Sequence, residues 1–318
     1  MDGLLIVDKP AGPTSHDVVA RMRRVLGERR IGHTGTLDPD ATGVLALVLG
    51  RATRLAQFLS ATDKSYEAVV RFGFATDTLD AGGVIVGGRH EGALPTRDAI
   101  ELALAPFRGT FLQQPPAFSA KKIDGKRSHK LARARRRTGS DPNGTVFVPL
   151  GSDPVAVSAL PAPATVTTTA ITIVRVDGDL VTLTVECSAG FYIRSLAHDL
   201  GEALGTGAHL ASLRRTRSGE CTLAQAIALD VAERDPARAA GHVLPLSAML
   251  TTWSPVVLTP EGVRRAVPGR DLGPGDAQTG FGNRESGFVR LMDPAGALIG
   301  IGAPARGTGL LHPSVVLV

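Results

Sequence analysis

Residues 32–45 read Gly-His-Thr-Gly-Thr-Leu-Asp-Pro-Asp-Ala-Thr-Gly-Val-Leu and run into an apolar stretch at residues 44–49. Pro39 biases Asp38 toward an extended conformation, and the glycines allow the backbone to approach a ligand closely. The stretch therefore predicts a loop that presents a carboxylate just before a buried strand. Such a carboxylate could act as a nucleophile, although Asp-Pro in a glycine-rich loop is also commonly a plain turn.

Hydrophobic patterns on both sides of this loop predict further elements. Residues 4–7 and 66–72 predict buried strands. Ser15 predicts the N-cap of a helix, because Val18 and Met22 follow it at helical spacing.

The second half of the chain continues the mixture of strands and helices. Residues 172–187 predict a β-hairpin that turns at Asp177-Gly178, since apolar and polar residues alternate in its second arm. Residues 192–204 predict a helix, and Thr96 predicts the cap of another that ends near residue 107.

The composition of the chain changes in two places. Residues 138–164 contain five prolines and no Lys or Arg, which predicts a surface insertion. From about residue 254, short apolar runs separated by Gly and Pro predict a small all-β module at 254–318. We therefore expect a larger domain at 1–245, with this module after it.

The bulk composition is that of a soluble globular protein, with 43% hydrophobic and 20% charged residues. No apolar run is long enough for a membrane span, and the N-terminus lacks the pattern of a signal peptide. The two cysteines lack metal-ligand spacing and are too few for a disulfide framework. We expect a cytoplasmic protein with reduced thiols.

Positive charge is concentrated in one segment. Residues 121–137 hold nine Lys or Arg and a single acid, whereas the whole chain has a net charge of only +5. Such a basic patch is typical of proteins that bind a phosphate backbone, although a charge run can also be a solvated helix face or a disordered arm.

Seven motifs in one order give the sequence a resemblance to the TruB family of tRNA pseudouridine synthases, over most of residues 3–220. The loop at residues 32–45 resembles the family's catalytic loop. The other motifs are Asp8-Lys9-Pro10-Ala11-Gly12 with Ser15-His16-Asp17, Lys64-Ser65-Tyr66, Thr76-Asp77-Thr78-Leu79-Asp80, Phe118-Ser119-Ala120-Lys121-Lys122 with Gly125-Lys126-Arg127, Gly190-Phe191-Tyr192-Ile193-Arg194, and Gly207-Ala208-His209-Leu210 with Leu213-Arg214-Arg215-Thr216.

The resemblance implies a fold and a reaction. The fold is α/β, with a mixed, mainly antiparallel sheet flanked by helices and a β-rich, PUA-like C-terminal domain. The reaction converts a uridine in the T loop of tRNA, position 55, to pseudouridine. Asp38 would attack the uridine, Arg194 would pair with Asp38, and Tyr66 would stack on the flipped-out base and take part in proton transfer.

The resemblance also implies residues that hold the substrate. His33 would fill the space left by the extruded base, and Tyr192 and Leu213 would line the uracil pocket, although Leu213 could equally be ordinary core. Lys9 is expected to bind substrate as well. Phosphates of the T arm would be gripped by Lys121, Lys122, Arg127 and Arg214, with Arg215 and Arg217 extending the track.

Some features depart from the family pattern or leave alternatives open. Ser128-His129 stands where the family commonly has Tyr after Gly-Lys-Arg, and Asp40 is an unusual second acid in the loop. We expect no cofactor and no metal, and a monomer that binds tRNA and no membrane. The alternatives are an RNA chaperone that promotes tRNA folding, a purely structural RNA-binding protein, or the same chemistry on another RNA.

Overall fold

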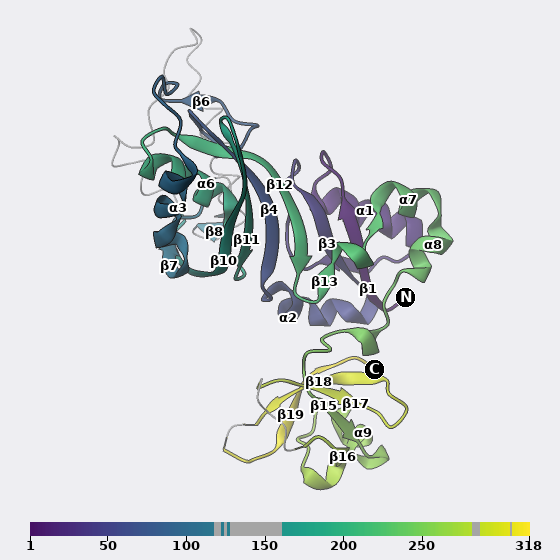
Figure 1. Cartoon of the computed structure of the whole chain (residues 1–318). Coiled ribbons are helices and arrows are strands. Elements are labelled where there is room, and N and C mark those ends of the chain that lie inside the picture. Colours follow the sequence, from purple (N-terminus) through teal and green to yellow (C-terminus); the bar gives the residue numbers. More distant parts are fainter. Residues whose placement is uncertain (118–121, 124–125, 128–160, 282–286, 306) are drawn as a thin grey trace. The chain divides into compact units, whose positions relative to one another are not determined.

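The computed structural model describes residues 1–117, 122–123, 126–127, 161–281, 287–305 and 307–318 (Figure 1). The chain forms two compact units. Unit 1 comprises Met1–Thr62 and Arg217–Val318, and unit 2 comprises Asp63–Thr216. Unit 1 is therefore built from both ends of the chain.

The first strands of unit 1 confirm the sequence prediction around the loop at residues 32–43. Strand β1 (Gly3–Lys9) pairs antiparallel with β3 (Thr42–Leu49) along its whole length and parallel with the short β14 (Ile227–Ala228). Strand β2 (Ile31–His33) pairs antiparallel with β3. The loop that carries Asp38 therefore runs from the end of β2 to the start of β3.

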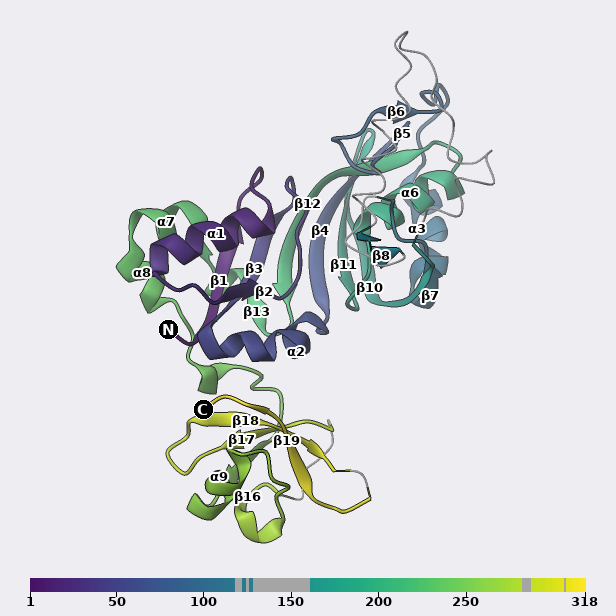
Figure 2. The same ribbon diagram turned by 180° about the vertical axis from the view of Figure 1, so that it is seen from behind.

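Three helices lie side by side in unit 1, namely α1 (Ser15–Leu26), α7 (Leu229–Arg234) and α8 (Pro236–Gly241) (Figures 1 and 2). Helix α1 begins one residue away from the predicted position. Its N-cap is Thr14, which exchanges hydrogen bonds with Asp17 in a capping box. Ser15 is not the cap, because its hydroxyl is used by a distant backbone segment.

The sheet strands of unit 2 run in the order β12 (Ala208–Ser218), β4 (Lys64–Phe72), β11 (Leu180–Cys187), β10 (Ala164–Asp177) and β7 (Gly109–Gln113), with β12 ending just inside unit 1. β4, β11, β10 and β7 pair antiparallel. The predicted hairpin is confirmed: Asp177 pairs with Leu180, and Gly178 in the turn has a φ of 59°, which favours glycine.

Helices α3 (Arg97–Leu104) and α6 (Ile193–Ala203) pack on this sheet and on each other (Figure 2). Thr96 caps α3 as predicted, and a 3₁₀ turn, Ala105–Phe107, continues it. The core between helices and sheet includes Phe72, Ile100, Leu183 and Leu196, all almost fully buried.

The C-terminal module of unit 1 is a five-stranded sheet with one helix. Its strand order is β16 (Ala277–Thr279), β15 (Pro255–Leu258), β17 (Val289–Met292), β18 (Leu298–Pro304) and β19 (Leu311–Val316). The expectation of an all-β module is wrong, because α9 (Pro260–Ala266) follows β15. The Thr259 side chain caps this helix and Pro260 begins it, which are standard start signals.

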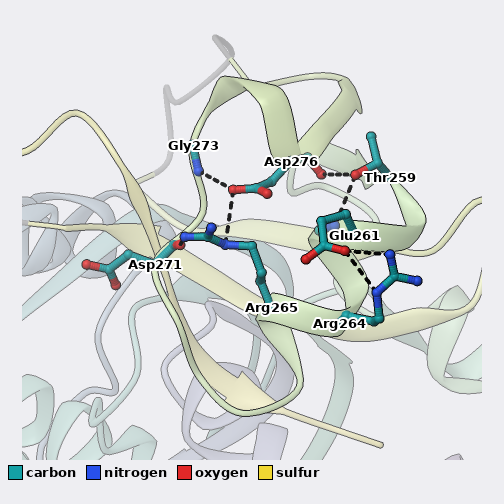
Figure 3. Close-up of polar contacts among 8 residues, drawn as sticks. Thr259, Glu261, Arg264, Arg265, Asp271, Gly273 and Asp276 are labelled. Carbon is teal, nitrogen blue, oxygen red and sulfur yellow. Dashed lines mark hydrogen bonds and ion pairs between the residues drawn. The ribbon is translucent and has the colours of Figure 1, made fainter.

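Polar contacts form within α9 and between α9 and the loop that follows it (Figure 3). Arg264 donates to Glu261 at 2.9 Å, and Arg265 lies 3.5 Å from Asp276. Asp276 also accepts a 2.8 Å bond from the Gly273 backbone. The two arginines of α9 are thus matched by carboxylates of the same module.

Shorter elements complete the described chain. They are α2 (Ala56–Ser60), β5 (Ala75–Thr76), β6 (Ile85–Val86), β8 (Lys122–Ile123), β9 (Lys126–Arg127), β13 (Cys221–Thr222) and the 3₁₀ turns Gly50–Leu55, Leu223–Gln225, Leu246–Ala248 and Pro274–Asp276. The expected fold class, a mixed and mainly antiparallel sheet flanked by helices with a separate β-rich C-terminal sheet, is confirmed. No helix in the described ranges is long and apolar enough to span a membrane.

Candidate active site

The Asp38 loop contains a tight turn. The Ala41 backbone N–H donates to the Asp38 carbonyl at 3.1 Å, which closes a four-residue turn with Pro39 in its second position. Proline is favoured there because its ring fixes φ near the value that the turn requires. Asp38 itself is half-buried, whereas Asp40 is exposed. The second acid of the loop therefore lies at the surface.

The start of helix α1 holds the residue before Asp38. The Ser15 hydroxyl accepts a 2.9 Å bond from the Leu37 N–H and donates a 3.2 Å bond to the Leu37 carbonyl. Ser15 is 1% exposed and Leu37 is 3% exposed. One side chain thus satisfies both polar groups of a buried backbone unit, which fixes the chain immediately before the carboxylate.

Lys9 holds the residues after Asp38. Its side chain is fully buried, and its ammonium donates to the carbonyls of Pro39 at 2.8 Å and Ala41 at 2.7 Å, and to that of Pro10 at 2.9 Å. The Gly12 N–H also donates to the Pro39 carbonyl, at 2.9 Å. A buried ammonium needs several acceptors because it has left water. The contacts of Lys9 therefore give it a positioning role in the Asp38 loop.

His33 is the last residue of strand β2, and the Asp38 loop begins directly after it. Its ring lies edge-on to the ring of His16, with centroids 5.2 Å apart and an interplanar angle of 84°. His16 belongs to the same Ser-His-Asp stretch that begins α1. Three residues of the predicted set, Lys9, His33 and Asp38, are thus brought together in unit 1 by β1, β2 and α1.

The residues expected to act on the uracil or on Asp38 from elsewhere in the chain, Tyr66, Tyr192, Arg194 and Leu213, lie in unit 2. Tyr66 is on β4, and both it and Leu213 on β12 pack against the core that lies between the sheet and α6. Arg194 is the second residue of α6 and is only 6% exposed. Unit 2 therefore gathers an aromatic, an aliphatic and a cationic side chain on one side of its sheet.

The position of Arg194 is not explained by the stability of its helix. A cation in the first turn faces the positive end of the helix dipole, which is unfavourable. Its guanidinium instead donates to the Thr78 carbonyl at 3.2 Å and lies 3.6 Å from the Asp80 carboxylate. Arg194 is therefore held by the loop at residues 76–83.

That loop is itself tightly organised around Asp80. The Asp80 carboxylate accepts bonds from the Thr78 hydroxyl at 2.6 Å and from the Gly82 N–H at 3.1 Å. Leu79 has a φ of 64°, a conformation that costs a non-glycine residue energy. Backbone bonds on either side of Asp80 join Leu79 and Ala81 to Leu210. The sequence motif at 76–80 marked this loop, but not the pairing of Asp80 with Arg194.

A further missed residue, Gln113, fixes Tyr192. The Gln113 side-chain amide accepts a 2.8 Å bond from the Tyr192 N–H and donates a 3.0 Å bond to the Tyr192 carbonyl. Gln114, the residue directly after β7, accepts a 2.7 Å bond from the Ser195 hydroxyl through its backbone carbonyl. Gln113 is 2% exposed. Neither strand β7 nor the burial of Gln113 was predicted from the sequence, so no local signal marked this residue.

The basic segment is described only in part. Lys121, Ser128-His129 and the insertion at residues 138–160 lie outside the described residues, whereas Lys122 and Arg127 are paired across the short strands β8 and β9. On β12, Arg214 is half-buried and Arg215 is only 2% exposed. Arg215 therefore does not present its guanidinium at the surface.

The described residues contain no group of three or more His, Cys, Asp or Glu that is arranged to hold a metal ion. Cys187 and Cys221 are both buried, and neither forms a disulfide bond.

Two family models match the chain. The model described as TruB family pseudouridylate synthase (N terminal domain) matches residues 23–146. The model described as tRNA pseudouridylate synthase B C-terminal domain matches residues 194–251. Both matches overlap the regions that carry the motifs.

Curated relatives and solved structures extend these matches to the whole chain. A tRNA pseudouridine synthase B from Solibacter usitatus (strain Ellin6076) is 40% identical over 319 residues, which is 100% of both chains. One from Mycobacterium sp. (strain KMS) is 43% identical over 86% of this chain and 84% of the relative. A chain in an H/ACA RNP bound to a substrate RNA containing 2'-deoxyuridine is 25% identical, with a TM-score of 0.69 over 99% of this chain and 85% of that one.

Proposed function

This chain belongs to the TruB family of pseudouridine synthases, and from that premise we propose that its target is uridine 55 in the T loop of tRNA and that Asp38 is its nucleophile. The chain is an isomerase that converts uridine to pseudouridine in tRNA. The observation that carries the assignment of Asp38 is the support of its loop. Ser15, Lys9 and Gly12 hold the residues on both sides of this one half-buried carboxylate.

In the proposed reaction the Asp38 carboxylate attacks the target nucleotide, at the sugar or at the ring. The glycosidic bond breaks, the uracil turns, and it is rejoined to the ribose through C5. A glycoside hydrolase would need two carboxylates beside the scissile bond. Asp40, the other acid of the loop, is exposed. One supported carboxylate fits an isomerase better than a hydrolase.

The other residues have proposed roles that follow from their chemistry. Enzymes that act on a base inside folded RNA extrude it first. His33 fills the space that the base leaves, while Tyr192 and Leu213 line the uracil pocket. Tyr66 stacks on the uracil and moves a proton late in the reaction, and Arg194 keeps the Asp38 carboxylate ionised by pairing with it.

RNA binding is assigned to the basic residues. Lys121, Lys122, Arg127 and Arg214 contact T-arm phosphates, and Lys9 contributes to substrate binding through the loop that it holds. We assign residues 1–245 to the catalytic domain, with an insertion at 138–164, and 254–318 to a PUA-like RNA-binding domain. The proposed enzyme is a cytoplasmic monomer that needs no cofactor or metal.

The position of the target is tested with tRNA transcripts that carry tritium at C5 of every uridine, because C5 loses its hydrogen when it bonds to the ribose. The purified chain is expected to release about one tritium per tRNA. Replacing the T-loop uridine 55 by cytidine should abolish this release. Continued release from the substituted transcript would place the reaction at another uridine, and release only from a different RNA would favour a non-tRNA target.

A further inference from the structure

Two cations are buried together in unit 2, and the proposed reaction does not use them. Lys64, the first residue of β4, is 6% exposed, and Arg215 on β12 is 2% exposed. Among the described residues, Arg215 has the largest side chain that is fully buried. Neither side chain is exposed enough to grip RNA phosphates from the surface. Burying charge is unfavourable unless other interactions compensate for it, so a buried pair of cations is a candidate for a role in the reaction.

The alternation of strand residues places both cations beside the predicted uracil site. Side chains two apart in a strand point to the same face, with Cα atoms about 7 Å apart. Lys64 therefore shares a face with Tyr66, and on β12 Arg215 shares a face with Leu213. Tyr66 and Leu213 both pack against the core under α6, and the proposed function assigns both of them to contacts with the uracil.

The opposite face of β4 shows that these cations are not part of a general charged surface. Arg71 lies on that face, because it is an odd number of residues from both Lys64 and Tyr66. It is 41% exposed and lies 3.1 Å from the Asp179 carboxylate. One face of the strand thus carries an ordinary surface ion pair, and the other carries a buried ammonium.

Electrostatics inside unit 2 identify the two cations as a coupled pair. Burial and, next in size, the positive charge of Arg215 together lower the pKa of Lys64 to about 8, against opposing effects of Cys187 and Asp63. Cys187 faces Lys64 from β11, where the two residues are paired. Tyr66 shares the face of β4 that carries Lys64, and α6, which packs against β4, carries the ionisable residues Arg194, His198, Asp199 and Glu202. The two cations therefore repel each other within this buried region.

We propose that Lys64 and Arg215 are positioning residues that supply positive charge beside Tyr66, so that its oxygen can carry negative charge when it takes the proton from C5. This inference rests on the proposed function. In the step, the C5–H bond of the rejoined uracil breaks, its electron pair forms the C5=C6 bond, and the π pair of the C6=N1 bond moves onto N1. The phenolate oxygen becomes a phenol, and N1 takes a proton from water, which leaves hydroxide, so charge and atoms balance.

The test compares Lys64→Met, Lys64→Arg and the control Arg71→Gln on the opposite face of β4. Methionine keeps the length of the stem, and replacing a buried charge by an apolar side chain is generally tolerated. Thermal unfolding and tRNA affinity are measured for each variant. Enzyme in excess over C5-tritiated tRNA then gives the single-turnover rate of C5–H cleavage between pH 6 and 9.

Lys64→Met is expected to lower this rate at pH 7 by roughly 100-fold, near the lower end of what a proton-transfer group contributes, with tRNA affinity unchanged. Its rate should recover as the pH rises, because hydroxide then forms the phenolate. With deuterium at C5, pseudouridine formation by this variant should show a primary isotope effect larger than that of the unsubstituted chain. Lys64→Arg, which stays charged, should remain within a few-fold of the unsubstituted rate, and Arg71→Gln should not differ from it.

Three results would overturn the inference. They are a pH–rate profile of Lys64→Met parallel to that of the unsubstituted chain, a Lys64→Arg variant as slow as Lys64→Met, and a loss that lies entirely in tRNA affinity. Failure of the proposed function looks different, because the unsubstituted chain would then release no tritium at any pH, and the inference would fall with it.

Discussion

The ammonium of Lys9 donates a 2.7 Å hydrogen bond to the backbone carbonyl of Ala41, 32 residues later in the chain. Together with the bond to Pro39 it spans the turn that follows Asp38. The relationship joins the end of β1 to the loop that precedes β3, and these two strands are paired. The Asp38 loop is therefore joined to strand β1 by this side chain.

Replacing Lys9 by methionine should loosen this turn. Each buried carbonyl that loses its donor costs about 1–3 kcal/mol, so the free energy of unfolding should fall by a few kcal/mol, and the tritium-release rate should fall by more than the population of unfolded protein explains. Denaturant unfolding and single-turnover rates test this. A Lys9→Met variant with full stability and full activity would contradict the positioning role.

Asp80→Asn should weaken the hold on Arg194. The carboxylate lies 3.6 Å from the guanidinium and also organises the turn around Leu79. Charge-assisted contacts are stronger than neutral ones, so we expect a loss of about tenfold or more in the rate of the chemical step, with little change in tRNA affinity. A variant that lost only tRNA affinity would show that Asp80 serves RNA binding instead.

Asp199→Asn should stabilise unit 2. Burial raises the pKa of the Asp199 carboxyl, Glu202 adds to the rise, and His198 opposes it. The native state therefore favours the protonated acid, and stability is lost as the pH rises from the ordinary aspartate range through the raised native pKa. At pH 7 the neutral asparagine avoids this cost, and the melting temperature should rise by a few degrees for about 1 kcal/mol.

The difference in melting temperature between the Asp199→Asn variant and the unsubstituted chain provides the check. It should be largest near neutral pH and shrink in acid, where Asp199 is protonated in both folded and unfolded states. A constant difference at all pH values would indicate an effect of shape rather than charge.

The sequence predicted those turns and helix caps that depend only on residues a few positions apart. The Asp177-Gly178 turn and the Thr96 cap were both identified, because each depends on residues within a few positions. Ser15 was misassigned as a cap. Its neighbour Thr14 forms the capping box, and Ser15 is used by Leu37, 22 residues away. A short cap motif does not reveal which of two adjacent hydroxyls the tertiary structure will use.

In the candidate site, too, the sequence predicted individual residues but not the contacts between residues that are distant in the chain. The family motifs identified Asp38, Tyr66 and Arg194, but not the contacts that support them. The Arg194–Asp80 pair, the Gln113–Tyr192 clamp and the Lys9–Ala41 bond each join residues that are distant in the chain. Helix α9 was missed for a different reason, since the Thr259-Pro260 start signal was present but too short to outweigh the strand pattern around it.

The central claim is that Asp38 is the nucleophile, and Asp40 offers a matched control on the same loop. We would measure tritium release from C5-labelled tRNA by the unsubstituted chain, Asp38→Asn and Asp40→Asn, together with the tRNA affinity of each. The account predicts that Asp38→Asn binds tRNA normally and releases no tritium, while Asp40→Asn releases about one per tRNA at close to the unsubstituted rate. Full release by Asp38→Asn, or equal loss in both variants, would contradict it.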